Sequence, residues 1–275
     1  MRVVRFRIAG ALVSQLSNNL AGTLPVLPYL AAAAAGLVTY AGYASMAPRS
    51  QFFGPTFTRG DDARKLALTY DDGPNDPHTL HLLDILAEQE VRATFFLIGR
   101  FAAQRPDIVR RIAEGGHVIG NHTYSHPNLI LCTPSRVAQE IDDCAQAIND
   151  AIGTHSNLFR PPFGGRRPGV LRVVRRRGLA PVMWSVTCYD WVASTNAQAI
   201  QRHAQRQMKH RGGNVILLHD GGHKAMGADR HHTVEASRGI IHASKGEGYQ
   251  FATVPELMQS QPQKTDVVAA RATLR

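Results

Sequence analysis

Residues 66–70 have the composition of a buried strand and run directly into the adjacent carboxylates Asp71 and Asp72. Two like charges side by side are unfavourable unless a cation or a proton lies between them. Gly73 and Pro74 come next, and Asp and Gly are also ordinary turn residues. The segment alone is therefore compatible with a metal site and equally with an Asp-rich turn.

His122 and His126 offer the nitrogen ligands that a metal site would need. They are four positions apart, so one helical turn would point both imidazoles the same way, and Pro127 prevents a longer helix. As a lone pair, such histidines are more often ordinary polar residues. With one carboxylate they give three protein ligands and an open position, the ligand count of a catalytic site. Zinc (Zn²⁺) fits this set, and Co²⁺, Ni²⁺ or other divalent ions would also be accepted.

Proton transfer in such a site could use the second acid and another histidine. An ion with an open position activates a bound water. Neighbouring side chains at a strand end diverge, so whichever acid is not a ligand could take that water's proton. His219 could protonate a leaving amine, oriented by Asp190 or Asp220. Taken singly, His219 could equally be a loop histidine.

Three further residues could complete a pocket. Arg160 could pair with the base carboxylate and hold it ionised. Trp191 and Leu217 could form the apolar wall of a small acyl pocket, although Trp191 alone would more often belong to a core.

Strand-like and helix-like stretches alternate from residue 64 onward. The predicted strands are residues 66–70, 93–98, 117–120, 158–159, 182–186, 215–218 and 250–253; the predicted helices are residues 79–89, 107–114, 134–152, 170–177 and 197–209, one before residue 250 and one from residue 255. Such alternation implies a mostly parallel sheet with covered faces. Seven or so units in about 200 residues favour a small or incomplete barrel over an open sheet. No Gly-rich fingerprint follows the first strand, which argues against a nucleotide-binding fold.

The unusual polar residues all follow predicted strands. They are Asp71-Asp72, His122 and His126, Arg160, Asp190-Trp191 and His219-Asp220. In a parallel barrel the carboxyl ends of the strands gather on one face, where active sites lie. The sequence therefore predicts that these residues form one site.

The N-terminal 60 residues have a different character. Arg2, Arg5 and Arg7 precede residues 20–44, in which only three tyrosines are ionisable. About 20 apolar residues suffice to cross a bilayer, and the arginines would keep the N-terminus cytoplasmic. We expect a single membrane anchor and linker over residues 1–60, a catalytic domain over 61–260 facing the extracytoplasmic side, and a flexible tail over 261–275. The alternatives are a cleaved signal peptide, and a hairpin or a helix lying on the domain.

The formal net charge of +10 raises the question of an acidic partner. One local concentration of arginines stands out: Arg166, Arg167, Arg172, Arg175, Arg176 and Arg177. No nucleic-acid-binding module accompanies it, so a nucleic-acid partner is not expected. The cluster is interpreted as a solvated helix face.

The remaining reactive side chains predict little. Three scattered cysteines, Cys132, Cys144 and Cys188, are too few for a disulfide framework and lack a paired metal-ligand spacing. They are interpreted as ordinary buried thiols, with a Cys132–Cys144 bridge as the alternative in an oxidising compartment. The other histidines, His223 among them, have no comparable setting, and His231-His232 is interpreted as a solvated loop.

Five segments together resemble the polysaccharide deacetylase family, the NodB homology domain of carbohydrate esterase family four. The matching segments are Thr69-Tyr70-Asp71-Asp72-Gly73-Pro74, His122-Thr123-Tyr124-Ser125-His126, Arg160-Pro161-Pro162-Phe163-Gly164, Asp190-Trp191 and Leu217-Leu218-His219-Asp220. They occur in the family's order and span residues 64–258. The resemblance implies a deformed (β/α)7-8 barrel with the N-terminal hydrophobic segment outside it.

The resemblance also implies roles for the first group of residues. Asp71 is similar to the family's catalytic base, and Asp72 with His122 and His126 to its metal ligands. Arg160 is similar to the residue that positions the base.

It implies roles for the acid side as well. Asp190 resembles the residue that tunes the general acid, which would be His219. The backbone N–H of Phe163 would help to hold the oxyanion, and Trp191 and Leu217 would line the acetyl pocket. Where the family often carries a further Asp, three positions before its Asp-Trp pair, this chain has Thr187, a departure that bears on substrate preference.

The implied activity is metal-dependent removal of N-acetyl groups from amino sugars of an envelope polysaccharide, peptidoglycan- or chitin-like. The partner would then be an N-acetylated glycan. Two alternatives stay open. One is a same-fold amidohydrolase or deformylase acting on a small molecule or a lipid-linked sugar, for which a closed pocket would be expected. The other is a glycan-binding protein without catalysis.

Overall fold

The computed structural model describes residues 26–208 and 213–259, which fall into two compact units, one up to Tyr43 and one from Ala44 onward. Helix α2 (Val26–Met46) contains the described part of the first unit, and its residues from Ala44 onward are counted with the second. No helix in the described ranges is both long and apolar enough to span a bilayer. The first residues of the predicted anchor and the predicted tail after residue 261 lie outside these ranges.

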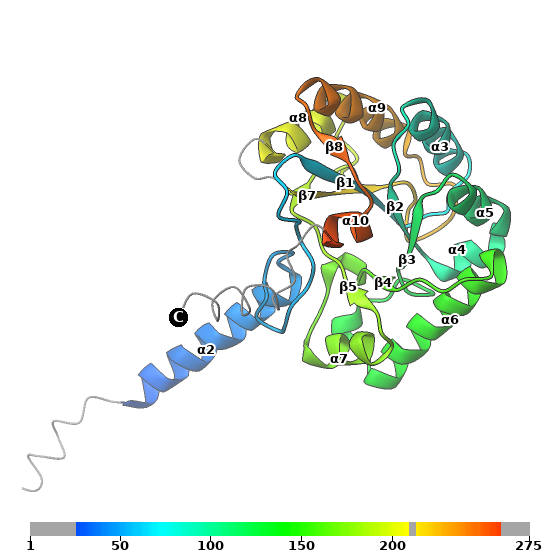
Figure 1. The fold of residues 1–275 in the computed structure, drawn as a ribbon. Helices are drawn as coiled ribbons and strands as arrows, with labels where there is room; N and C mark the ends of the chain where they lie inside the picture. The colour runs from blue at the N-terminus through cyan, green and yellow to red at the C-terminus, as the bar shows by residue number, and fades with distance from the viewer. Residues whose placement is uncertain (1–25, 209–212, 260–275) are drawn as a thin grey trace, which may run out of the picture. The chain divides into compact units, whose positions relative to one another are not determined.

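The second unit is built on a parallel sheet of eight strands, which curls around its inner face (Figure 1). The strands are β1 (Lys65–Asp71), β2 (Thr94–Leu97), β3 (Val118–Asn121), β4 (Leu158–Phe159), β5 (Ala180–Pro181), β6 (Val186–Thr187), β7 (Asn214–His219) and β8 (Gln250–Phe251). Their order is β5-β4-β3-β2-β1-β7-β6, and β8 pairs with the start of β1. The predicted deformed (β/α) barrel is confirmed.

Helices pack on the outer face of this sheet. They are α3 (His78–Glu88), α4 (Gly99–Gln104), α5 (Pro106–Glu114), α6 (Pro134–Ile152), α7 (Pro168–Arg176), α8 (Ala197–Met208) and α9 (His231–Gly246). The last helix, α10 (Val254–Gln259), packs instead in a separate cluster that contains Ala67 of β1. The α6 bounds match the prediction because Thr133 caps its start by accepting the Arg136 N–H, and Gly153 ends it in a left-handed conformation. The short helix α4 was not predicted.

Alternation along β1 explains how the sheet carries the site. Leu66, Leu68 and Tyr70 face outward into the larger core, against α3, α8 and α9. Ala67 faces inward, as a period of two requires. Thr69 and Asp71 lie on the same inward side, so β1 ends with a carboxylate on the inner face of the sheet, at its carboxyl edge.

The predicted strand over residues 182–186 is wrong except at its last residue. Strand β5 ends at Pro181 and strand β6 begins at Val186, and between them Val182 makes only an isolated bridge to Phe57. The backbone leaves the ladder here because the carbonyls of Val182 and Met183 accept hydrogen bonds from the Arg160 guanidinium at 3.4 and 3.1 Å.

Two interpretations of basic residues also need correction. Arg166 is not solvated: it is buried and donates to the carbonyls of Gly164, Ala47 and Ser50. His231 is not in a loop, because it opens helix α9. The cysteines are free thiols, as predicted, and Cys144 and Cys188 are buried, but Cys132 is only partly buried.

Candidate active site

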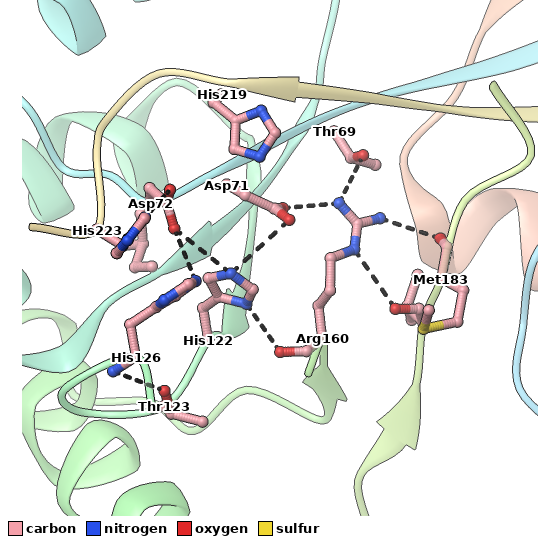
Figure 2. Close-up of polar contacts among 12 residues, drawn as sticks. Thr69, Asp71, Asp72, His122, Thr123, His126, Arg160, Met183, His219 and His223 are labelled. Atoms are coloured by element: carbon pink, nitrogen blue, oxygen red, sulfur yellow. Dashed lines mark hydrogen bonds and ion pairs between the residues drawn. The ribbon is translucent and has the colours of Figure 1, made fainter. Parts of the chain in front are cut away.

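Asp72, His122 and His126 meet at the carboxyl edge of the sheet, although β1 and β3 deliver them from distant parts of the chain (Figure 2). One Asp72 oxygen, Oδ1, lies 3.2 Å from His126 Nε2 and 3.6 Å from His122 Nε2. One ligand atom from each residue lies within 4.8 Å of the others. The predicted meeting of one acid with the histidine pair is therefore present.

A helical turn was predicted to present His122 and His126, and this prediction is wrong. Thr123 and His126 both have positive φ, at 67° and 60°, so a loop brings the rings together. The buried Glu140 carboxylate shapes that loop by accepting the N–H and the O–H of Ser125. The ring centroids of His122 and His126 then lie 4.9 Å apart.

The chemistry of these three side chains fits a divalent cation. His122 Nδ1 lies 2.8 Å from the Arg160 carbonyl oxygen; donation there leaves Nε2 as the lone-pair nitrogen facing Asp72. Burial lowers the pKa of His122 to about 3 and that of His126 to about 2, so both rings are neutral ligands. Asp72 Oδ1 is buried and has no hydrogen-bond partner among the described residues. A cation at this point would satisfy that oxygen.

Burial also raises the pKa of Asp72 to about 7, with His219 opposing the rise and Asp71 adding to it. A bound cation would favour the carboxylate and reverse this shift. The backbone of Asp72 is left-handed, with φ 74°, a conformation that costs on the order of 1 kcal/mol and clusters at functional sites. It is held by a close approach of Gly221, where a Cβ would lie 2.2 Å from the Asp72 carbonyl oxygen.

Asp71 faces a different partner. Its Oδ1 accepts from Arg160 Nη1 at 2.7 Å, and the same nitrogen donates to Thr69 Oγ1 at 2.8 Å (Figure 2). The Arg160 side chain is fully buried and lies over the Phe96 ring. Burial raises the pKa of Asp71, and the guanidinium opposes that rise. The second oxygen, Oδ2, lies 3.8 Å from His122 Nε2, so Asp71 borders the same cavity without a direct contact to the His126 ring.

His219 lies across the cavity and is held by Asp190, not by Asp220. Asp190 accepts from the His219 backbone N–H at 2.6 Å and lies 2.8 Å from its Nδ1. Burial alone would lower the pKa of His219, but the charge and hydrogen bond of Asp190, with the charges of Asp72 and Asp71, together raise that pKa to about 9. Asp220 instead accepts from the Thr79 hydroxyl and turns away from His219.

These groups surround one cavity of about 670 Å³. Leu217 is buried in its wall, whereas Phe163 and Trp191 stand at its mouth, 45% and 44% exposed. Trp184 is a wall residue that sequence reasoning missed, because it lies in the wrongly predicted strand. Thr187 accepts the Trp184 indole N–H at 3.0 Å and so fixes that ring.

His223 was also missed. It lies in the loop after β7, and its ring stacks on that of His126, with centroids 4.8 Å apart and planes at 18°. Its Nδ1 is 4.0 Å from Asp72 Oδ2. The loop folds back because Asn75 donates to the carbonyls of Asp220 and Ala228. The rule that polar residues after strands gather at one edge would have found His223 had it been applied beyond His219-Asp220.

The comparisons with known proteins agree with this geometry. The family model for polysaccharide deacetylase matches residues 58–182. A chitooligosaccharide deacetylase of Rhizobium leguminosarum bv. trifolii is 34% identical over 206 residues, covering 72% of this chain and 93% of the relative.

Two solved structures are similar to most of this chain. A peptidoglycan N-acetylglucosamine deacetylase is 35% identical with a TM-score of 0.68, covering 75% of this chain and 93% of that one. A family 4 acetyl xylan esterase from Clostridium thermocellum, in complex with a cobalt ion, is 33% identical with a TM-score of 0.64, covering 71% and 90%. The chain therefore belongs to the polysaccharide deacetylase family of hydrolases, carbohydrate esterase family four.

Proposed function

We propose that this protein removes N-acetyl groups from amino sugars of an envelope polysaccharide that is peptidoglycan- or chitin-like. One observation carries the proposal: an acid with two neutral histidines, a second acid paired with a buried arginine, and a histidine paired with a third acid all border one cavity. Hydrolysis of an amide needs these three functions, namely an electrophile, a base and an acid.

Asp72, His122 and His126 would hold a divalent cation. Their mixed nitrogen and oxygen donors suit Zn²⁺ best, and Co²⁺ or Ni²⁺ would also be accepted; the cobalt-bound esterase structure is consistent with this range. When bound, such an ion supplies Lewis acidity toward the acetamide carbonyl and lowers the pKa of water at the site.

Asp71 is assigned the role of general base. It would take a proton from the water that attacks the acetamide carbon, and Arg160 keeps its carboxylate ionised and fixed in direction. The Phe163 backbone N–H is assigned to the developing oxyanion, which a preorganised donor stabilises. As the C–N bond breaks, His219 would give its proton to the departing nitrogen, leaving acetate and a free amine.

An open mouth favours a polymer over a small molecule. Phe163 and Trp191 are exposed on the rim, and the buried Leu217 gives the apolar surface that an acetyl methyl group needs. The relatives that are named as chitooligosaccharide and peptidoglycan deacetylases favour an N-acetylglucosamine-containing glycan.

An extracytoplasmic location is part of the proposal. Arg2, Arg5 and Arg7 followed by residues 20–44, with no charged side chain, favour export with the N-terminal segment serving as a membrane anchor or export signal. Protease added outside intact cells should degrade the catalytic unit if it faces outward, and should spare it otherwise.

The direct test is acetate release from N-acetylglucosamine oligomers and from peptidoglycan, with Zn²⁺, Co²⁺ or Ni²⁺ added to chelator-treated protein. Restoration of acetate release by one of these ions is expected. Failure to release acetate from every glycan by a metal-loaded, folded protein would refute the proposal.

A further inference from the structure

Tyr189 has a backbone conformation that a tyrosine rarely adopts. Its φ is 57°, in the left-handed region that favours glycine or asparagine. The residue follows β6, in a turn where the Val192 N–H donates to the Tyr189 carbonyl at 3.2 Å. Such outliers persist where the surroundings enforce them, and they cluster at functional sites.

The neighbours of Tyr189 explain how it is enforced. Cys188 is fully buried in the larger core, and the Asp190 side chain is tied to His219 by contacts of 2.6 and 2.8 Å. Both flanking side chains therefore point inward. The left-handed turn sends the ring between them outward, where 45% of Tyr189 remains exposed.

The exposed ring continues a line of rings that starts in the cavity. The Trp191 ring lies 5.2 Å from that of His219 and 5.5 Å from that of Tyr189, centroid to centroid. Trp191 lines the cavity, whereas Tyr189 lies outside its lining. The Tyr189 ring also contacts His203 of α8, with centroids 5.3 Å apart. The rings of His219, Trp191 and Tyr189 therefore form a line that leads from the cavity outward over the surface.

We propose that Tyr189 is a glycan-binding residue, whose ring receives the sugar next to the one whose acetamide group enters the cavity. This inference rests on the proposed function. The faces of a β-linked pyranose ring carry C–H bonds, which the negative face of an aromatic ring attracts. The spacing from Trp191 to Tyr189 is comparable to the length of one sugar unit. The substrate is then an oligomer or polymer, with at least two adjacent sugars bound.

The experiment compares chain lengths. Activity on the N-acetylglucosamine monomer and on its tetramer is measured for the wild type and for Tyr189→Ala and Tyr189→Phe. Loss of an aromatic contact at an interface typically costs a factor of about five to ten in affinity. Tyr189→Ala should raise KM for the tetramer by about that factor and leave the monomer unchanged, whereas Tyr189→Phe should resemble the wild type.

Two further variants separate binding from folding. Tyr189→Gly relieves the backbone conformation, so its unfolding midpoint should be no lower than that of Tyr189→Ala, while its KM for the tetramer should rise by the same factor. His203→Ala removes the packing partner on α8 and should leave tetramer KM unchanged. Leu131→Ala, an exposed apolar residue away from the cavity, is the matched surface control.

Equal effects of Tyr189→Ala on monomer and tetramer would overturn the inference, as would a His203→Ala variant that reproduces the tetramer defect. A wild-type protein that releases no acetate and binds no tetramer by calorimetry would instead overturn the proposed function on which it rests.

Discussion

The histidines on the two sides of the cavity are the same residue type in opposite electrostatic states. On one side, burial lowers the pKa values of His122 and His126 to about 3 and about 2. On the other side, the Asp190 carboxylate raises the pKa of His219 to about 9. The difference follows from the group at Nδ1. His122 Nδ1 faces the neutral Arg160 carbonyl, whereas a carboxylate, that of Asp190, lies 2.8 Å from His219 Nδ1.

This contrast in pKa suits the two sides of the cavity to different roles. A metal ligand must offer a lone pair, so it must be neutral, whereas a general acid must carry a proton at working pH. The fold meets both demands within one cavity by ending β3 against the Arg160 carbonyl and β7 against the Asp190 carboxylate. Substitutions on each side should therefore fail in different ways.

The largest effect on activity is expected on the neutral side of the cavity, the side of His122, His126 and Asp72. Asp72→Ala or His126→Ala should lower kcat/KM on the order of a thousandfold or more, since the metal's electrophilic contribution of several kcal/mol would be lost. Metal content measured on the purified variants should fall in parallel. His81→Ala, an exposed histidine on α3, should change neither quantity. Full activity in a variant without bound metal would show that this side is not a cation site.

The next largest effect on activity is expected on the charged side of the cavity, the side of His219 and Asp190. His219→Ala should lower kcat roughly a hundredfold or more, as is typical for a general acid, with metal content unchanged. Asp190→Asn removes the charge that raises the pKa of His219, so the pKa falls and the ring loses its proton at lower pH. The alkaline limb of the pH–activity profile should therefore move to lower pH. An unmoved limb in Asp190→Asn would separate His219 from the acid role.

The sequence predicted the residues of both sides but not the backbone that presents them. Each of the motif residues follows a strand, and the parallel topology alone makes those ends converge. The helical turn predicted for His122 and His126 was wrong because Glu140, on α6, binds Ser125 and shapes the intervening loop. A contact between residues so far apart in the chain has no periodicity by which it could be recognised.

Other features depend on tertiary contacts in the same way. The segment over residues 182–186 has strand composition, but the carbonyls of Val182 and Met183 accept hydrogen bonds from Arg160 instead of from a neighbouring strand. The position of His223 depends on Asn75, which pins the loop after β7 through its side-chain amide. The exposed ring of Tyr189 depends on two inward-pointing neighbours. Local propensity is overridden in each case.

A smaller effect on activity is expected between the two sides, at the Asp71–Arg160 pair. Arg160→Met leaves a buried carboxylate unpaired, so the free energy of unfolding should drop by about 3–5 kcal/mol. It also removes the charge that opposes the rise in the pKa of Asp71, so the acidic limb of the activity profile should move to higher pH and kcat should fall on the order of tenfold to a hundredfold.

Denaturant unfolding of the single and double variants checks the origin of this effect. In Arg160→Met combined with Asp71→Asn, part of the lost stability should return because no unpaired charge stays buried, while activity should not return. A double variant as unstable as the sum of the two singles would mean that the pair is not coupled.

The smallest effect is expected at His223, which touches the neutral side without being needed to complete it. Its ring stacks on His126 with centroids 4.8 Å apart and also contacts the Phe163 ring at 5.3 Å. Removing it frees His126 to rotate, and loss of such outer contacts typically weakens metal binding about tenfold. His223→Ala should therefore raise the Kd for Zn²⁺ by about that factor, measured by competition with a chelating dye, while kcat at saturating metal stays nearly constant. His223→Phe keeps a flat ring against His126 and should retain wild-type affinity for Zn²⁺. If His223→Phe binds Zn²⁺ as weakly as His223→Ala, the imidazole nitrogen of His223 supports the site and the ring packing does not. His223 would then belong with His122 and His126 as a third polar ring on that side of the cavity.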